Sequence, residues 1–489
     1  MLKFVFKYLE IYKIKFLFVL FCSVLTATAD LLMPYLTAKF IDEILESRDL
    51  HRFYCFILVL IAINVLSVIT NWVYVILSTK IQANVINELI EDLIRRVQKI
   101  QNEFLFNTDM IYLSKRIEKD ATDLISIILG SLIDVSIQVI LLLMSVFLLY
   151  SIGVKWVLMF FIIAFLHFVI YRLLKQSLLE RSTAARETEP QYFTAFSDNF
   201  LYIYSIKLHS LYDEFTSKFR TSFEEYFKAG LLEAKINFWF AYSRSNSSKI
   251  FNILIFLLGG FDVLNHEMTV GNFVALNGYY HFAMQSVSYF MGLGQGYQNA
   301  KSAYMRILEI EEQPIESNGE TVLEKINIIE LNNVKYQFNK QVILNDFTYT
   351  FERGKIYCIV GKNGAGKTTL LNVIRNLLKP QNGEVKYNNT SISNIDMIDA
   401  RKRLIAVVEQ KDFIKNDNLS GGERRKLSIK KALSKSADVL IMDEPDNNLD
   451  SDGMKKLIEF INTKKKNQIT LIITHDDKLI EIADEVVNI

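Results

Sequence analysis

Three features of this 489-residue chain are scarce or evenly balanced, and each narrows what the protein can be. The three cysteines, Cys22, Cys55 and Cys358, form no Cys-x-x-Cys pair and no metal-ligand spacing, so we expect them to pack as small apolar residues. The chain has only five prolines, which permits long uninterrupted helices. Lysine and arginine total 55 against 54 acidic residues, and no basic block dominates, so we expect no nucleic-acid partner.

Apolar residues, in contrast, make up 51% of the chain and concentrate in its first 300 residues, as in a membrane protein. A helix needs about 20 mostly apolar residues to cross a bilayer. Six spans are expected at about 16–36, 53–77, 124–150, 156–174, 251–264 and 273–293. The fifth is short, so its helix is expected to begin upstream, near residues 236–242. The sequence therefore predicts an all-α transmembrane domain with six helices over residues 1–312.

Basic residues predict the orientation of these spans. The start of the chain and the polar stretches 80–122 and 172–249 carry many lysines and arginines, whereas the loops on the opposite side carry few. We therefore expect both termini on the cytoplasmic side of a cytoplasmic (inner) membrane, with the lipid bilayer as a partner. The two polar stretches show helical periodicity and are expected to be membrane helices extended into the cytoplasm. Each pair should end in a short helix, near 102–109 and 198–210, although amphipathic loops on the membrane surface are an alternative.

After a linker at 313–326, strand-like and helix-like runs alternate over residues 327–489. Strands are expected at 328–336, 347–351, 356–360, 383–387, 404–408, 439–443, 470–474 and 485–489, and helices at 367–377, 421–434 and 451–463. This order predicts an α/β domain with a mixed, mainly parallel sheet. In such a domain the ligand binds at the carboxyl ends of the strands.

A phosphate-binding loop is the clearest motif of this second domain. Residues 361–369 read G-x-x-x-x-G-K-T-T between a strand-like and a helix-like run. The glycines let backbone N–H groups surround phosphate oxygens, Lys367 would reach the outer phosphates, and Thr368 would hold Mg²⁺. The nucleotide contacts are expected from Gly361, Asn363, Gly364, Gly366, Lys367, Thr368 and Thr369. A glycine turn that happens to contain a lysine is the alternative, but it leaves the spacing and both flanking runs unexplained.

Polar side chains end several of the other predicted strands. Asp443 suits Mg²⁺, and Glu444 after it can polarise an attacking water. Without the phosphate loop, such an Asp-Glu pair would more often be a solvated turn. His475 ends another strand, where it can contact the γ-phosphate, although a lone histidine is often structural. Gln410 suits the positioning of water or Mg²⁺.

Ser420, Gly421 and Gly422 open the predicted helix 421–434, with Glu423 completing a capping box. The phosphate loop, Gln410, residues 419–423, the Asp443–Glu444 pair, residues 448–450 and His475 follow one another in the order found in ATP-binding cassette (ABC) proteins. The whole chain resembles an exporter half-transporter of that family, with six spans fused to one nucleotide-binding domain.

The resemblance implies roles for individual residues. Phe338 would stack on adenine, with Tyr336 as the alternative, and Gln410 would sense the nucleotide. Ser420, Gly421 and Gly422 match the signature that closes on the partner's ATP, and Asp450 matches the loop that contacts the other subunit. Asp443, Glu444 and His475 match the Mg²⁺ aspartate, the catalytic glutamate and the switch histidine. ATP and Mg²⁺ are the cofactors implied.

The chain departs from the family between Gln410 and Ser420, where a helical subdomain of several dozen residues is nearly absent. Its link to the membrane helices would then depend on Gln410 and its neighbours. The resemblance implies a homodimeric ATP-driven exporter, and a small peptide is the predicted substrate. The alternatives are a lipid or drug exporter, a heterodimer subunit, and a membrane-anchored ATP-binding regulator that transports nothing. Within the spans, the polar residues Asp30, Asp134, Gln138 and His167 stand out as candidate substrate contacts.

Overall fold

The computed structural model describes residues 1–44, 49–106, 108, 110–338, 341–362, 364–410, 421–447 and 449–489. The chain divides into two compact units, which are described separately. The helical unit comprises Met1–Asp92 and Arg116–Leu308. The cassette unit comprises Leu93–Lys115 and Glu309–Ile489, so part of the polar stretch 80–122 belongs to the second unit.

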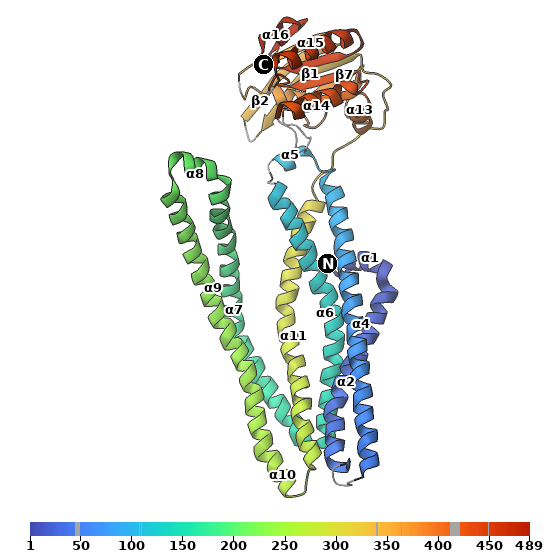
Figure 1. The fold of residues 1–489 in the computed structure, drawn as a ribbon, viewed down its shortest axis with the longest axis vertical. Coiled ribbons are helices and arrows are strands. Elements are labelled where there is room, and N and C mark those ends of the chain that lie inside the picture. Colours follow the sequence, from blue (N-terminus) through green and yellow to red (C-terminus); the bar gives the residue numbers. More distant parts are fainter. Residues whose placement is uncertain are drawn as a thin grey trace. The chain divides into compact units, whose positions relative to one another are not determined.

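Long helices make up the helical unit (Figure 1). The elements are α1 (Leu2–Leu9), η1 (Glu10–Tyr12), α2 (Lys13–Lys39), η2 (Phe40–Ile44), α4 (Leu50–Val97), α6 (Met110–Ile152), α7 (Val154–Leu201), α8 (Ile203–His209), α9 (Tyr212–Leu254), η3 (Ile255–Gly259), α10 (Gly260–Leu264) and α11 (Val270–Glu311). The helix of the fifth predicted span does begin upstream, but at Tyr212 and not near the expected 236–242, and α9 continues through η3 into α10. All six predicted spans therefore lie in long helices.

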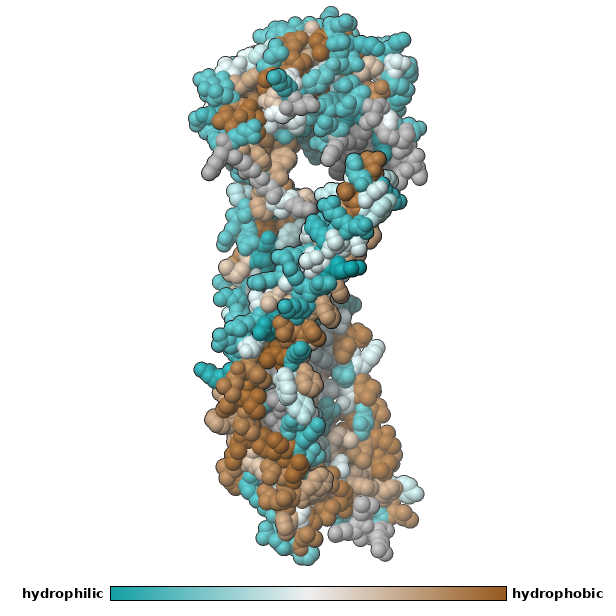
Figure 2. All heavy atoms as spheres, turned by 90° about the vertical axis from the view of Figure 1, so that its left-hand side faces the viewer, coloured by the Kyte–Doolittle hydropathy of each residue, from teal (hydrophilic) through white to brown (hydrophobic). Residues whose placement is uncertain are grey.

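Four helical stretches within the described residues are long and apolar enough to cross a membrane, as the sequence predicted for its first four spans. They are Leu2–Glu43, Leu50–Val97, Tyr112–Ile152 and Val154–Leu201. α9 and α11 are of similar length but are not among these four stretches. On the face shown in Figure 2, hydrophobic side chains cover the lower part of the helical unit, and hydrophilic ones replace them further along the helices. This division fits helices that run beyond the bilayer.

Close backbone contacts hold α2 against α11. A Cβ atom on Gly278 would lie 2.6 Å from the Cγ atom of Pro34, so only glycine fits at that crossing. The amide of Gly271 donates a hydrogen bond of 2.8 Å to the Oδ1 atom of Asp42 at the start of α11. Nearby, the rings of Phe251 and Tyr280 stack with their centroids 3.4 Å apart. These contacts fix the end of the bundle that lies beside α10.

α7 and α9 form a hairpin whose tip is the short helix α8, so the prediction of a short helix near 198–210 is confirmed. Aromatic side chains pair across the hairpin, and the rings of Tyr192 and Tyr226 stack at 5.0 Å. An ion pair of 3.0 Å between Lys218 and Asp198 adds to them. The stretch therefore consists of two packed helices rather than loops on the membrane surface.

The cassette unit has the predicted α/β fold, and its antiparallel strands form a sheet of their own. One sheet is parallel, in the order β6-β7-β8-β3-β9, and the other is antiparallel, in the order β2-β1-β4-β5. The strands are β1 (Ile328–Phe338), β2 (Gln341–Glu352), β3 (Ile356–Val360), β4 (Asn382–Tyr387), β5 (Thr390–Ser391), β6 (Ile405–Val408), β7 (Val439–Asp443), β8 (Ile469–Ile473) and β9 (Glu485–Asn488). The helices are α5 (Asn102–Phe106), α12 (Lys367–Ile374), α13 (Met397–Arg403), α14 (Gly421–Ser434), α15 (Ser451–Lys464), η4 (Lys465–Asn467) and α16 (Asp477–Glu481).

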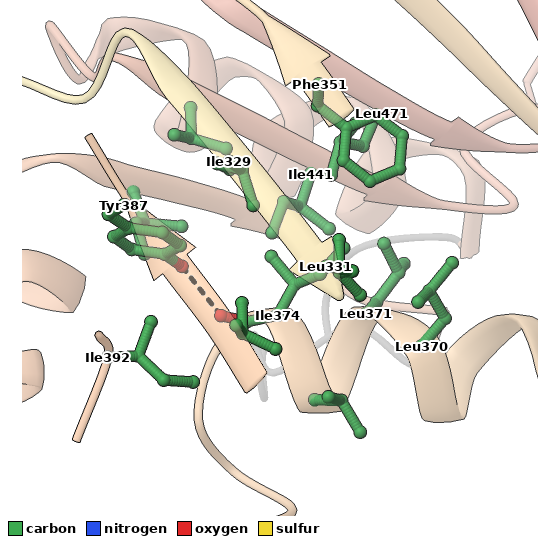
Figure 3. Close-up of a cluster of buried hydrophobic side chains, with 14 of the residues drawn as sticks. Ile329, Leu331, Phe351, Leu370, Leu371, Ile374, Tyr387, Ile392, Ile441 and Leu471 are labelled. Atoms are coloured by element: carbon green, nitrogen blue, oxygen red, sulfur yellow. Dashed lines mark hydrogen bonds between the residues drawn. The ribbon is translucent and has the colours of Figure 1, made fainter. Parts of the chain in front are cut away.

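The two sheets face each other across one buried core, and α12 packs into it (Figure 3). Ile441 and Leu471 enter this core from the parallel strands, and Ile329 and Phe351 enter it from the antiparallel ones. The hydroxyl of Tyr387 donates a hydrogen bond of 2.7 Å to the carbonyl of Ile374 at the end of α12. This core fixes α12, and with it the loop that precedes α12, against the sheet edge.

Residues 313–326, predicted as a linker, are hydrogen-bonded along much of their length. Ile315 pairs with Ile100 in an antiparallel bridge, and Thr321 pairs with Ile395. The amide of Ile326 donates a hydrogen bond of 3.0 Å to the Oδ2 atom of Asp438. The segment therefore connects the residues next to α5 to the rest of the cassette.

The cysteines divide by environment. Cys22 and Cys358 are buried, as expected of small apolar residues that pack, whereas Cys55 is exposed on α4. Cys55 lies in an apolar helix that is long enough to cross a membrane, and a small apolar side chain can face lipid there. Hydrophobic sequence alone does not separate a lipid-facing position from a core position.

Candidate functional site

The loop predicted to bind phosphate follows β3 and leads directly into α12. Gly364 and Gly366 have φ angles of +83° and +103°, which glycine adopts without strain. A Cβ atom at Gly366 would also lie 2.5 Å from the Cγ2 atom of Ile343, so this position has no room for a side chain. The loop therefore turns tightly before the positive end of α12, an arrangement that suits an anion. Asn363 lies outside the described residues.

Lys367 is folded back over this loop and is only 7% exposed. Its Nζ atom donates hydrogen bonds to the carbonyls of Gly361 and Lys362, at 2.6 and 3.2 Å, and lies 3.3 Å from the Nε2 atom of His475. The predicted phosphate lysine and the predicted switch histidine therefore meet, although they are far apart in the sequence. An ammonium group held by carbonyls at the mouth of a glycine-rich loop is well placed for an anionic ligand. Thr369 follows in the first turn of α12.

Thr368 and Asp443 form a second pair at the same edge of the sheet. The Thr368 hydroxyl donates a hydrogen bond of 3.1 Å to the Oδ2 atom of Asp443, the last residue of β7. Burial raises the pKa of the Asp443 carboxyl, while the hydrogen bond from Thr368 and the charge of Arg375 act in the opposite direction. Hydroxyl and carboxylate oxygens are ligands that Mg²⁺ accepts, with phosphate and water completing its shell.

Among the described residues, this site offers no cluster of side chains that could hold a resident metal ion. In the part of the chain that the structure describes, no three His, Cys, Asp or Glu side chains gather as metal ligands. A metal held by Thr368 and Asp443 would therefore need a nucleotide and water for its other positions. This donor set fits Mg²⁺ that arrives with ATP and does not fit a structural zinc.

Glu444 has a left-handed backbone, with a φ angle of +47°, which is uncommon for a residue with a side chain. Two amides hold one oxygen of its carboxylate. The Nε2 atom of Gln410 and the Nδ2 atom of Asn447 each donate a hydrogen bond of 2.7 Å to Oε2. The structure thus brings the predicted Gln410 to the predicted Glu444, and the two amides fix the direction of the carboxylate.

Arg425 is a further residue of this region that the sequence did not reveal. It is 1% exposed, although it lies in a charged run of α14 that reads as a solvated helix face. Its guanidinium donates hydrogen bonds to the backbone carbonyls of Glu409, Asp443 and Glu444, the Asp443 bond being 3.0 Å long. One buried cation therefore ties the ends of β6 and β7 together beside Glu444. No local motif marks this role, because the three acceptors are backbone atoms.

The two aromatic candidates for adenine stacking differ in exposure. Tyr336 is 2% exposed and belongs to the core between the sheets. Phe338 ends β1 and is only partly buried against the same core. Phe338 therefore offers more of its ring to a ligand than Tyr336 does, and the stacking role stays a prediction.

The predicted signature is described only in part, because Ser420 and the rest of 411–420 lie outside the described residues. Gly421 and Gly422 open α14. Asp450 caps α15 by accepting a hydrogen bond of 2.8 Å from the amide of Gly453, and it accepts another of 2.8 Å from Lys426 on α14. Asp450 therefore joins the two helices within one chain, and its predicted contact with another subunit stays a prediction.

Comparison with known families gives two matches. The family model described as "ABC transporter transmembrane region" matches residues 16–287, which is more than half of the chain. The family model described as "ABC transporter" matches residues 344–418. The second match includes the phosphate loop and Gln410. The transmembrane model covers most of the helical unit.

Several curated proteins are similar to the chain. The Beta-(1-->2)glucan export ATP-binding/permease protein NdvA of Bartonella bacilliformis is 24% identical over 379 residues, or 66% of this chain and 63% of that protein. The ATP-dependent lipid A-core flippase of Burkholderia pseudomallei is 25% identical over 274 residues, or 45% and 46%. The ribosome protection protein VmlR of Bacillus subtilis is 34% identical over 168 residues, or 32% and 30%. The chain thus covers less than two thirds of each relative.

Proposed function

Because the chain belongs to the ABC transporter family, we propose that it is an ATP-driven exporter whose cassette drives movement of its membrane helices. The observation that carries this proposal is the set of residues at one edge of the parallel sheet. Six side chains from four separate segments meet there in three pairs, which are Lys367 with His475, Thr368 with Asp443, and Gln410 with Glu444. The same chain supplies helices apolar enough to cross a membrane.

Different residues are proposed to bind the phosphates, the base and the metal ion. Lys367 and the amides of the glycine loop would hold the phosphates, and Phe338 would stack on the base. Thr368 and Asp443 would hold Mg²⁺, with Gln410 as a further candidate. ATP supplies, when bound, the phosphoryl group and the free energy of its hydrolysis. Burial raises the pKa of Asp443 in the free protein, and metal binding would favour the ionised form of this carboxyl.

Glu444 is proposed to orient the attacking water. Its carboxylate is held through Oε2 by Gln410 and Asn447. Its backbone N–H donates a hydrogen bond of 2.9 Å to the carbonyl of Ile473, which anchors the left-handed backbone. A fixed carboxylate beside the phosphate loop can accept a proton from water as water attacks. His475, in contact with Lys367, is proposed to monitor the outer phosphate from the end of β8.

A second copy of the chain is the proposed partner. The tip of the α7–α9 hairpin exposes large apolar side chains, with Tyr204 86% exposed and Leu208 79% exposed. Large apolar side chains exposed together on one short helix suit a contact with a protein or a membrane, and we propose the second copy as the partner. In this family each ATP site is built from motifs of two chains. This chain carries all of these motifs, so two copies would form two complete sites. Ser420, Gly421 and Gly422 of one copy would then close on the nucleotide of the other.

The link between cassette and membrane helices is proposed to run through α5. The side-chain amide of Asn102 donates a hydrogen bond of 3.1 Å to the carbonyl of Leu377, three residues after the end of α12. Arg96, at the end of α4, donates a hydrogen bond of 2.8 Å to the carbonyl of Gln313. A shift of the phosphate-loop helix would therefore be passed to α5 and to the end of α4.

The substrate is proposed to be a small peptide or another amphipathic molecule that leaves across the cytoplasmic membrane, with both termini of the chain inside. Tyr279 and Tyr280 of α11 are buried in the helical core, so they pack rather than line a cavity within one chain. The names of two relatives concern export of a glucan and flipping of lipid A core, so a glycolipid is the second candidate. Neither class is favoured by a contact within the described residues.

The test uses the purified full chain in lipid vesicles, with ATP hydrolysis and ATP binding measured separately. Glu444→Gln should abolish hydrolysis while ATP still binds, because Lys367 and the loop are unchanged. Glu459→Gln, an exposed residue on α15 in the same cassette, is the matched control and should keep both activities. Normal turnover by Glu444→Gln would refute its role. ATP binding by the wild type without hydrolysis would favour the regulator, and inactivity of the pure chain alone would favour a heterodimer.

A further inference from the structure

A groove of about 650 Å³ runs along the first helix of the chain and the beginning of α2. Its walls combine two kinds of side chain. Phe6, Leu9, Phe16, Leu17 and Leu20 form an apolar lining. Lys3, Lys7 and Lys13 line the groove together with one acidic residue, Glu10. The groove is therefore apolar along its length and carries an excess of positive charge.

The helix that forms one wall of the groove is anchored to the rest of the helical unit. The hydroxyl of Tyr8 donates a hydrogen bond of 3.1 Å to the Oδ2 atom of Asp92, and that of Tyr12 donates one of 2.7 Å to the Oε1 atom of Glu88. The ring of Phe4 meets the ring of Tyr304 on α11 edge-on, at 5.4 Å. These contacts hold α1 against α4 and α11, so the groove is a built feature and not the side of a loose terminal helix.

We propose that this groove binds an anionic phospholipid, with the lysines on its headgroup and the apolar side chains along an acyl chain. Lys3 and Lys7 are one helical turn apart, and Lys13 opens α2, so three ammonium groups lie along one groove. The groove lies within Leu2–Glu43, at the N-terminal end of the first membrane-crossing stretch. A cluster of lysines next to the end of a membrane-crossing helix is typical of a site for anionic lipid.

The lysines and the apolar side chains of the groove together distinguish an anionic lipid from the other possible ligands. A free phosphate or a soluble phosphorylated metabolite would use the lysines and leave Phe6 and Leu17 exposed to water, as they are at 46% and 63%. A zwitterionic lipid would use the apolar lining but would gain little from three ammonium groups. An anionic lipid uses both, because its acyl chain covers the apolar side chains while its phosphate lies among the lysines.

The test measures lipid binding by the purified full chain in detergent, without nucleotide, so that it is independent of the proposed transport activity. The probes are dioctanoyl phosphatidylglycerol, dioctanoyl phosphatidylcholine and glycerol phosphate. Phosphatidylglycerol should bind at least about tenfold more tightly than phosphatidylcholine, because a lysine near a charged headgroup contributes about a factor of five. Glycerol phosphate should bind weakly and should not displace the lipid.

Two triple variants separate the groove from general charge. Lys3→Gln, Lys7→Gln and Lys13→Gln together should remove the preference for phosphatidylglycerol. The control replaces Lys80, Lys228 and Lys235, which are exposed on α4 and α9, by Gln and should keep it. Leu17→Asp, on the apolar lining, should weaken both lipids. A preference that survives the first triple variant, equal binding of the two lipids by the wild type, or displacement by glycerol phosphate would overturn the proposal.

Discussion

Replacing Arg425 by Met should damage catalysis far more than it damages ATP binding. The side chain is almost fully buried, and its guanidinium bonds to the carbonyls of Glu409, Asp443 and Glu444. Met keeps much of the volume but donates nothing, so three carbonyls lose a charged donor. A hydrogen bond to a charged group contributes roughly 1.5–3 kcal/mol, and bonds that share one donor group are not additive. We therefore expect the cassette to lose about 3–5 kcal/mol of stability.

The catalytic effect of Arg425→Met follows from what these carbonyls position. Glu444 has a left-handed backbone that its neighbours must hold, and Arg425 holds it from the carbonyl side. A shift of about 1 Å in a catalytic group can lower the rate by roughly a hundredfold. The predicted result is a fall in kcat of about that size, with little change in the affinity for ATP. Lys367 is held by the carbonyls of Gly361 and Lys362, and Thr368 by the Asp443 side chain, so the nucleotide contacts should remain.

The assay is steady-state ATP hydrolysis together with nucleotide binding and denaturant unfolding of the full chain. Arg425→Lys keeps the charge but loses the planar fork, so its losses should be intermediate. Lys430→Met changes an exposed residue on the same helix and should behave like the wild type. Wild-type kcat and wild-type stability in Arg425→Met would show that the three hydrogen bonds position nothing, and would refute the reasoning.

Three further changes test other parts of the cassette. Gly366→Ala should abolish ATP binding, measured by nucleotide titration, since its Cβ atom would lie 2.5 Å from a side-chain atom of Ile343. Asp443→Asn should raise the melting temperature of the nucleotide-free protein at pH 7 while abolishing Mg²⁺-dependent hydrolysis. Because burial raises the pKa of Asp443 in the folded protein, ionisation of this carboxyl lowers the free energy of unfolding as pH rises above about 4. The gain in melting temperature from Asp443→Asn should therefore vanish below about pH 4. Asn102→Ala should speed hydrogen exchange in α5 about fivefold, because one bond to Leu377 is lost.

The parallel strands β3, β6, β7 and β8 were predictable because each is short, apolar and almost entirely buried, whereas the edge strand β9 is partly exposed. The bounds of β3 and β7 agree with the prediction, since each run ends at a glycine or a carboxylate that starts the next turn. The sequence did not show α13 and α16, which are short and capped. Asp396 accepts from the amide of Asp399, and Asp476 from the amide of Lys478. Their caps are visible in the sequence, but helices of so few residues have no periodicity to detect.

The candidate site was predictable to the extent that side chains follow strands. Asp443 ends a buried strand, Glu444 and His475 lie just after buried strands, and parallel strands bring such ends together. Two other features depend on backbone atoms and on contacts between distant segments. Arg425 reads as surface charge until its carbonyl acceptors are known, and Ile100 pairs with Ile315 across more than two hundred residues. No sequence pattern predicts either contact.

The contact of α5 also bears on the short stretch between Gln410 and Ser420. The sequence suggested that coupling would depend on Gln410 and its neighbours, because the usual helical subdomain is nearly absent. The hydrogen bond between Asn102 and Leu377 would provide the proposed second route, from the segment after α12 to α5. This route lies within the cassette unit and needs no helical subdomain. A chain that kept this route could shorten the stretch after Gln410 and still pass the state of its phosphate loop to its membrane helices.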